Sequence, residues 1–243
     1  MTNSAPKRPN INTTPIDIQD YFKVAISVDC VIFGFDDNAL KVLLIKCNLK
    51  EYEGSWSLLG DLVRPDEDLE TASYRVLKER TGLDDLYLEQ VQTFGGLNRH
   101  PAGRVVTIAY YSLVNIKHHQ LKLSDNEVHW HPLNDITRLA FDHKKILDLC
   151  YLQLQKNIQE KPLVFNLLGN KFSLRELQHL YEAILGTKLD RRNFRKKIST
   201  TGLLIDTNEI ESDVPHRPGK LYKFNYQKYQ KQLQRANGSK PQG

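Results

Sequence analysis

The sequence predicts an α+β domain followed by a smaller domain in which two helices precede a β-hairpin. Two observations lead to this prediction. The first 160 residues alternate between β-branched, aromatic runs and segments with a helical period of apolar residues. Charge also divides the chain: residues 1–162 contain 19 Lys and Arg against 22 Asp and Glu, whereas residues 163–243 contain 15 against 7. The balances of −3 and +8 indicate a mildly acidic body joined to a module that faces a polyanion.

Strands in the first domain are predicted from runs rich in Val, Ile, Phe and Tyr. The turn at Asp36-Asp37-Asn38 joins the first two strands into a hairpin. Apolar residues at helical spacing predict an inserted helix, and Gly82 stands where its C-cap belongs. The expected strands are Lys23–Phe35, Leu40–Lys46, Leu88–Phe94, Arg104–Val114 and Glu127–Pro132, and the expected helices are Asp66–Arg80 and a helix from an Asp142 N-cap to Gln159.

The second domain begins where Lys161-Pro162 breaks the preceding helix. Ser173 and Glu176 form a capping-box pattern, in which each side chain satisfies a backbone donor of the other residue. Gly186 ends this helix and Asp190 caps the next. This order of elements is that of a winged helix-turn-helix. Its expected elements are a strand at Leu163–Leu168, a helix ending at Leu185, a helix from Asp190 to Ser199, and strands at Leu203–Thr207 and Leu221–Phe224.

Composition excludes several classes of protein. No apolar stretch approaches the roughly 18 residues of a membrane span, and the first 20 residues lack the apolar core of a signal peptide. Cys30, Cys47 and Cys150 are unevenly spaced and provide neither a disulfide framework nor a metal-binding pattern. We therefore expect a soluble, cytoplasmic protein with no cofactor and no membrane contact.

Residues 61–83 resemble the Nudix box, whose pattern is G-x5-E-x7-R-E-U-x-E-E-x-G-U with U apolar. The flanking segments Trp56–Gly60 and Leu139–His143 and the residue Trp130 are also similar to this family, so that the resemblance covers about residues 22–150. It implies an α/β/α sandwich for the first domain. The positions that match the box at the required spacing are Glu67, Arg75, Leu77, Glu79, Gly82 and Leu83.

The same helix departs from the pattern where the family binds metal. Nudix hydrolases hold Mg²⁺ or Mn²⁺ with carboxylates at i, i+3 and i+4, which lie on one helical face. Here these positions are Val76, Glu79 and Arg80, and Asp61 replaces the leading Gly. We therefore predict no metal site and no catalytic residue. Val76 is expected in the core, and Glu79 is expected to pair with Arg75 rather than hold a metal. Arg80 is either a solvated charge or a contact to a polar ligand.

The second helix of the basic domain has Phe194 and Ile198 on its buried face and cations on the others. Side chains near the start of such a helix reach base edges in the major groove, and the wing reaches the adjacent groove or backbone. The alternatives are a solvated charged helix or a face that binds RNA or protein. The turn, the cap and the wing favour DNA. The predicted DNA-binding residues are Arg191, Arg192, Asn193, Arg195, Lys196, Lys197, His216, Arg217 and Lys220.

The two halves together resemble the NrtR-like family of Nudix-related transcriptional regulators. The similar segments of the tail are Phe165–Leu168, Phe172–Leu174, Leu189–Lys197 and Leu221–Asn225. The resemblance implies a homodimer that binds double-stranded operator DNA and releases it when a small-molecule effector occupies the sensor. In the branch that controls NAD synthesis the effector is ADP-ribose, and in sugar-utilisation branches it is a sugar such as arabinose.

The loop at residues 94–104 contains three glycines, so it can approach a ligand closely. It resembles the R-D-P-R-G-R loop of ADP-ribose hydrolases, with His100 in place of the acid and Ala102 in place of an arginine. Arg99 and Arg104 of this loop either hold an anion or cap loop carbonyls. The predicted effector-binding residues are Asp29, Lys46, Asp61, Arg64, Arg80, Arg99 and Arg104.

We expect a flexible arm at residues 1–20, a Nudix-like ligand-sensing domain at 21–160, a winged-helix DNA-binding domain at 161–232 and a disordered tail at 233–243. The sequence favours a ligand-responsive transcriptional regulator, a repressor of NAD-related or sugar-utilisation genes. One alternative is an active Nudix hydrolase of a nucleoside-diphosphate derivative such as ADP-ribose, which would use Glu67, Glu79 and acids such as Asp61. The other is an adaptor that binds protein or RNA.

Overall fold

The computed structural model describes residues 23–36, 39–83, 86–117, 121, 128–160, 163–212, 214–215 and 217–238. The predicted arm at residues 1–20 and the predicted wing residue His216 lie outside the described residues. Within the described part of the chain, no helix is long and apolar enough to cross a membrane.

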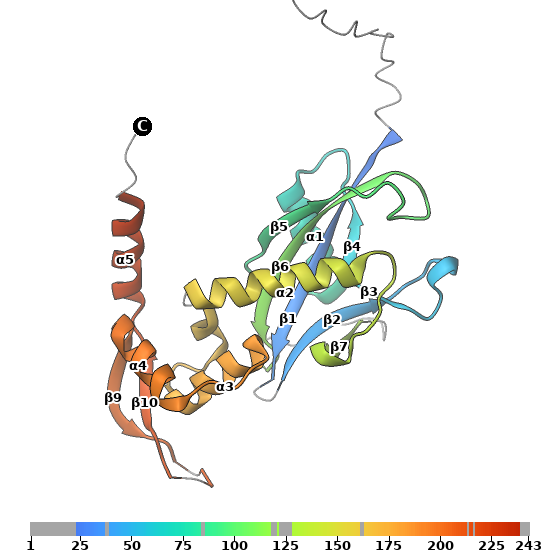
Figure 1. Cartoon of the computed structure of the whole chain (residues 1–243). Helices are drawn as coiled ribbons and strands as arrows, with labels where there is room; N and C mark the ends of the chain where they lie inside the picture. Colours follow the sequence, from blue (N-terminus) through green and yellow to red (C-terminus); the bar gives the residue numbers. More distant parts are fainter. Residues whose placement is uncertain are drawn as a thin grey trace, which may run out of the picture.

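The first domain is built on a mixed sheet (Figure 1). Its strands are β1 (Ala25–Phe35), β2 (Leu40–Lys46), β3 (Trp56–Ser57), β4 (Leu59–Leu62), β5 (Glu89–Phe94), β6 (Val105–Asn115) and β7 (Val128–Pro132). The continuous path is β3-β2-β1-β6-β5, with β4 paired to β1 and β7 paired to β2. β1 and β6 run parallel from the pair Ala25–Val105 to the pair Phe35–Asn115, whereas the other pairings are antiparallel. The predicted hairpin of the first two strands is confirmed.

Helices cover both faces of this sheet, because alternate side chains of β1 belong to two core clusters. Phe33 packs in the cluster that includes residues of α2 (His143–Glu160). Cys30 and Ile32 pack in the cluster that includes residues of α1 (Leu69–Thr81). The α/β/α sandwich that the resemblance implied is therefore the observed fold. Two short 3-10 helices, η2 (Lys50–Tyr52) and η3 (Leu133–Asp135), lie in the connections.

The second domain has the winged-helix order. It contains η4 (Leu163–Leu167), β8 (Phe172–Ser173), α3 (Leu174–Leu185), α4 (Arg191–Thr201), β9 (Leu204–Ile210), β10 (Lys220–Phe224) and α5 (Tyr226–Gly238). The predicted capping box is confirmed: Ser173 Oγ accepts from Glu176 N, and the Glu176 carboxylate accepts from Ser173 N. Asp190 caps α4 through Asn193 N, and Gly186 and Gly202 end the two helices with positive φ.

Three features of the second domain differ from the sequence prediction. The predicted strand at Leu163–Leu168 is wrong, because this segment is the 3-10 helix η4. The turn directs Val164, Phe165 and Leu167 into the core, where Phe165 stacks on Phe224 with 4.3 Å between ring centroids. The short strand β8, which pairs with β10, was not predicted. The predicted disordered tail from residue 233 begins inside α5, which continues to Gly238.

The winged helix packs directly on the first domain. Leu154 and Ile158 of α2 share one core cluster with Leu177 and Leu180 of α3. Gln155 Nε2 donates to the carbonyls of Ile184 and Leu185, which are left without helical partners at the end of α3. In Figure 1, α2 crosses the sheet and its C-terminal end lies beside the winged-helix elements. The helix that covers one face of the sheet is therefore also the support of the second domain.

Candidate functional site

A cleft of about 350 Å³ opens at one edge of the first domain. Residues of β1, β2 and β4, the loop between β5 and β6, and the segment before α2 line it. Five of the predicted effector-binding residues lie around this cleft, although they come from distant parts of the sequence. They are Asp29, Lys46, Asp61, Arg80 and Arg99.

Arg64 and Arg104 do not line the cleft. Arg104 Nη1 donates to the carbonyls of Gly95 and Gly96 at 2.7 and 2.9 Å, so it caps the loop, as one of its two predicted roles required. Arg64 Nη2 lies 3.2 Å from Glu79 Oε1 on the outer side of α1. The structure therefore separates these two arginines from the other five predicted residues.

Arg99 is buried and forms the floor of the cleft. Its Nε and Nη2 donate to the two carboxylate oxygens of Asp142 at 3.2 and 2.8 Å. Nη2 also lies 3.4 Å from Asp29 Oδ2. The side chains of Arg99 and Asp29 are only 4% and 6% exposed, so this is a buried ion cluster rather than a solvated pair. Two carboxylates thus compensate the charge of Arg99.

His143 completes the floor. Its Nδ1 accepts a hydrogen bond from Leu58 N at 3.0 Å and lies 3.0 Å from Ser57 Oγ, while Nε2 lies 3.5 Å from Asp29 Oδ1. Because Leu58 N is a donor, Nδ1 carries no proton, and the proton of the neutral ring is on Nε2, toward Asp29. Burial lowers the pKa of His143, although Asp29 opposes this effect. The imidazole is therefore a neutral, positioned group.

Phe141 forms an aromatic wall of the cleft. Its φ of 54° lies in the left-handed region, which is costly for a bulky side chain. The ring stacks on His100 with centroids 4.9 Å apart and contacts Tyr52 at 4.5 Å. Phe141, Asp142 and His143 were not among the predicted site residues. They lie within the Leu139–His143 segment that resembled the Nudix family, so the signal was present in the sequence.

Lys46 and Arg80 are the other cations of the cleft. Lys46 Nζ lies 3.9 Å from the ring centroid of Trp56 and donates to Gly54 O at 3.3 Å. Arg80 Nη2 lies 4.0 Å from Asp61 Oδ2, and its side chain is 40% exposed. Both cations are held near the cleft by contacts weaker than the buried pair of Arg99.

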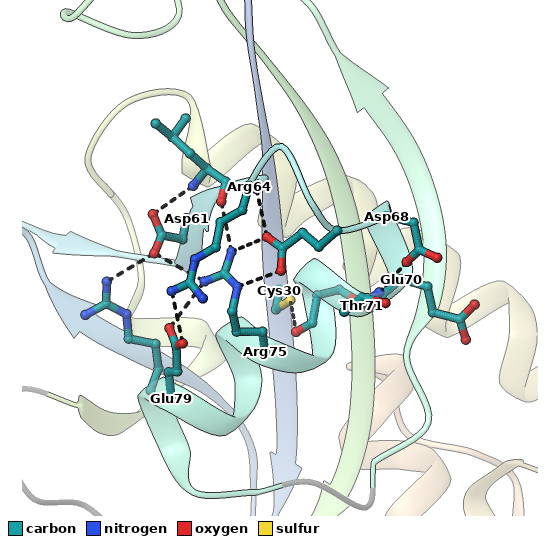
Figure 2. A network of polar contacts seen from close by, with 12 residues as sticks. Cys30, Asp61, Arg64, Asp68, Glu70, Thr71, Arg75 and Glu79 are labelled. Atoms are coloured by element: carbon teal, nitrogen blue, oxygen red, sulfur yellow. Dashed lines mark hydrogen bonds and ion pairs between the residues drawn. The ribbon is translucent and has the colours of Figure 1, made fainter.

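Arginines engage the acids of the box (Figure 2). Arg75 Nη2 and Nε donate to the two oxygens of Glu67 at 2.6 and 2.8 Å. Arg75 Nη1 lies 3.2 Å from Glu79 Oε2 and 3.6 Å from Asp61 Oδ2. The predicted pair of Glu79 with Arg75 is confirmed, and Val76 is buried as predicted. The Arg75 hydrogen bond, aided by the backbone N–H of Arg64, lowers the pKa of Glu67 from 4.5 to about 2.

The cations of α4 that were predicted to bind DNA are exposed. Arg191 and Arg195 line a groove of about 420 Å³ together with Arg217 and Lys220 of the wing. Lys220 Nζ is 2.7 Å from Asp206 Oδ2, so a neighbouring carboxylate partly balances its charge. Arg175 of α3 also lines this groove and was not predicted. Arg175 lies between Ser173 and Glu176, the two residues of the capping box that sets the start of α3. The first turn of α3 therefore lies beside the wing.

Asn193 and Lys197 lie on a different side of α4. They line a second groove of about 420 Å³, together with Glu160 at the end of α2 and Tyr181 of α3. Arg192 and Lys196 are exposed and line neither groove. The predicted DNA-binding residues of the helix thus lie on three sides of it: beside the wing, toward the first domain, and away from both grooves.

Known proteins resemble this chain in both domains. The NUDIX domain model matches residues 23–150, and the NrtR DNA-binding winged helix domain model matches residues 164–224. The ADPR responsive transcriptional repressor NtrR of Acinetobacter baylyi is 34% identical over 215 residues, 86% of either chain. The chain belongs to the NrtR family.

Solved structures agree with this membership. Shewanella oneidensis NrtR in complex with a 27mer DNA has a TM-score of 0.68 at 32% identity, over 82% of this chain and 93% of that one. The NUDIX domain of the same NrtR protein, complexed with ADP ribose, has a TM-score of 0.51 at 32% identity, over 58% of this chain and 94% of that one. The ADP-ribose pyrophosphatase of Methanocaldococcus jannaschii is 33% identical over 129 residues, 52% of this chain and 73% of that protein.

The Nudix half of an NrtR protein raises the question of a metal ion on α1. A hard divalent cation needs several oxygen ligands whose lone pairs are available. Both oxygens of Glu67 accept from Arg75, and each oxygen of Glu79 lies 3.2 Å from an arginine nitrogen. Val76 supplies no ligand atom and is 1% exposed. The residues present do not fit a magnesium or manganese ion.

The Glu67–Arg75 pair predicts a pH dependence of stability. Because the folded state lowers the pKa of Glu67 from 4.5 to about 2, the pair stabilises the fold above about pH 4.5 and this contribution is lost as pH falls toward 2. We expect the Tm of the wild type to fall more steeply than that of Glu67→Gln between about pH 5 and pH 3. Glu70→Gln, which removes an exposed acid of α1 outside this network, is the control and should keep the wild-type slope. Equal slopes for wild type and E67Q would contradict the prediction.

Proposed function

We propose that this chain is an ADP-ribose-responsive transcriptional repressor. In this proposal α4 and the wing bind operator DNA, and the cleft of the first domain binds the effector. The likeness to an ADPR responsive repressor along 86% of the chain, across both domains, is the observation that carries the proposal. The regulated genes are then NAD-related rather than sugar-utilisation genes.

The charge of α4 supports a DNA-binding role. Arg191, Arg192, Arg195 and Lys196 are exposed on a helix that ends the helix-turn-helix, and Arg217 of the wing lies beside it. Such a helix places side chains at base edges while its neighbours neutralise phosphates. A homodimer would set two copies of α4 about 34 Å apart, one helical turn of DNA, and so bind a palindromic operator.

Removal of a base-reading arginine should weaken specific DNA binding. We expect Arg195→Ala to cost about 1–3 kcal/mol in affinity for the promoter DNA of its own gene, and to reduce discrimination against scrambled DNA. Fluorescence anisotropy with a labelled duplex measures both effects. The matched control is Arg138→Ala, which removes the same charge from an exposed position in the first domain. An unchanged affinity for R195A, or an equal loss for R138A, would favour the alternative of a protein- or RNA-binding adaptor.

The chemistry of the cleft favours ADP-ribose over a simple sugar. ADP-ribose presents an aromatic base and a diphosphate, and the cleft presents the aromatic wall of Phe141 and the cations Lys46 and Arg80. An arabinose molecule has neither an aromatic base nor a charged group, so it would leave the positive charges of Lys46 and Arg80 without an anionic partner in the ligand. Asp29 and Asp61 add acceptors for ribose hydroxyl groups. The cleft is thus mixed aromatic, cationic and acidic, as the parts of a nucleotide sugar require.

Regulation without hydrolysis is part of the proposal. Val76 and Arg80 stand at two of the three metal-binding positions of the box, and each oxygen of the third residue, Glu79, lies 3.2 Å from an arginine nitrogen, so an effector would be bound and released unchanged.

ADP-ribose should release the protein from DNA without being consumed. We expect DNA affinity to fall at least tenfold when ADP-ribose saturates the cleft, a coupling of about 1.4 kcal/mol. The same anisotropy assay measures this effect, and arabinose serves as the control ligand. Chromatography of ADP-ribose incubated with the protein and Mg²⁺ tests consumption. Turnover at ordinary enzymatic rates would instead establish the hydrolase alternative.

Arg80 and Arg64 provide a matched pair of variants for the cleft. Arg80 lines the cleft and Arg64 does not, although both belong to the box and each lies beside one of its acids. We expect Arg80→Gln to weaken ADP-ribose binding by about 2 kcal/mol, or roughly thirtyfold in Kd, because a charged hydrogen bond to a phosphate is lost. Arg64→Gln should bind as the wild type does. Isothermal titration calorimetry measures both, and equal affinities for the two variants would remove Arg80 from the site.

A further inference from the structure

We propose that the buried Arg99–Asp142 ion pair couples the effector cleft to the winged helix through α2. An anionic group of the effector bonds to Arg99 in competition with Asp142, and the release of Asp142 frees the start of α2. This inference rests on the proposed function, because it describes how occupation of the cleft changes DNA binding.

The pair joins a cleft residue to the residue that precedes α2. Arg99 lines the cleft and donates to both oxygens of Asp142, whose carbonyl in turn accepts from Lys145 N and Ile146 N in the first turn of the helix. The Asp142 side chain therefore ties the helix to the floor of the cleft. The planar N–H donors of a guanidinium can bind two oxygens of a carboxylate or of a phosphate group in the same geometry. Arg99 is therefore suited to exchange the carboxylate of Asp142 for a phosphate group of the effector.

The start of α2 is also strained and pinned. Phe141 has the costly φ of 54°, and His143 is held by Leu58 N and Asp29. Phe141 and His143 both line the cleft. Loss of the Arg99 contact lets residue 141 leave the left-handed region, so the segment has a second arrangement available to it. In this proposal the strained segment is the element with two arrangements that coupling between sites requires, and the Arg99–Asp142 pair is the restraint that the effector removes.

The far end of α2 carries the winged helix. α2 is a single helix of 18 residues, about 27 Å long, so it transmits a displacement as one body. Gln155 holds the end of α3 through Ile184 O and Leu185 O, and Ile158 lies in the core cluster that contains Phe194 of α4. A shift at Asp142 therefore changes the position of α4 relative to the first domain, and in a dimer it changes the separation of the two DNA-binding helices.

The proposed coupling predicts that the affinities for DNA and for effector change in opposite directions. If the effector binds only the state in which Asp142 is released and DNA binds only the other state, a variant that favours the released state binds effector more tightly and DNA more weakly. General damage to the fold would instead weaken both. Asp142→Asn removes the charge that holds Arg99 and keeps the size of the side chain, so it should mimic the bound effector.

The experiment measures the Kd of the full chain for promoter DNA without ligand, and for ADP-ribose without DNA. We expect D142N to bind DNA about tenfold more weakly and ADP-ribose about tenfold more tightly than the wild type. Asp148→Asn, which removes an exposed acid from α2 that pairs only with Lys144 in the described contacts, should change neither Kd. Arg99→Lys keeps the buried positive charge but loses the planar pair of N–H donors. It should weaken DNA binding by a smaller factor than D142N does. This variant provides the test if D142N does not fold.

The outcomes separate the two proposals. Unchanged DNA affinity in D142N and R99K, or a parallel loss of both affinities in D142N, would overturn the coupling role of the pair. If the wild type does not bind ADP-ribose, the proposed effector is wrong. The DNA affinities of the ligand-free variants still decide whether the Arg99–Asp142 pair controls the winged helix.

Discussion

The two-sided burial of β1 is the constraint from which the rest of the structure follows. This strand contributes side chains to both core clusters and pairs with β2, β4 and β6, so from Val28 to Phe35 both of its faces are buried. One helix must therefore cover each side of the sheet, α1 on one and α2 on the other. Asp29 is an acid on this buried strand, and the burial of its carboxylate requires Arg99 as a charge partner. This buried pair of Asp29 and Arg99 lines the cleft.

The first domain keeps the framework of a hydrolase fold with a different distribution of charge. Helix α1 keeps the caps and the core face of the Nudix box, since these depend on apolar spacing and on Gly82. The side chains on its outer face form an acid–arginine network centred on Arg75, which contacts Glu67, Glu79 and Asp61. Through Glu67 and Asp61, the network ties the segment before α1 to the helix by direct ion pairs.

α2 has three structural roles that no single segment of sequence indicates. It covers one face of the sheet, closes the floor of the cleft with His143, and supports the winged helix with Gln155 and Ile158. A helix that makes all three contacts cannot move at one end without a response at the other, because protein cores are densely packed. Core packing and the hydrogen bonds of Gln155 thereby connect the helix α4 to the domain that contains the cleft.

The sequence by itself determined the local features of this protein. Periodicity, caps and turn residues predicted most elements, including the capping box at Ser173 and the pairing of Glu79 with Arg75, because these depend on neighbours within a few residues. The 3-10 conformation of Leu163–Leu167, the strand β8 and the helix α5 were missed, since short or polar segments follow their tertiary surroundings.

Only the tertiary structure decided which charges meet. Asp29, Arg99 and Asp142 are separated by 70 and 43 positions, yet they share one buried cluster, whereas Arg104, five residues after Arg99, caps its own loop. Side-chain partners across such distances depend on the register of β1 with β6 and on the placement of α2. The sequence pattern therefore identified the two domains, and the fold selected the residues that form the cleft and its link to α4.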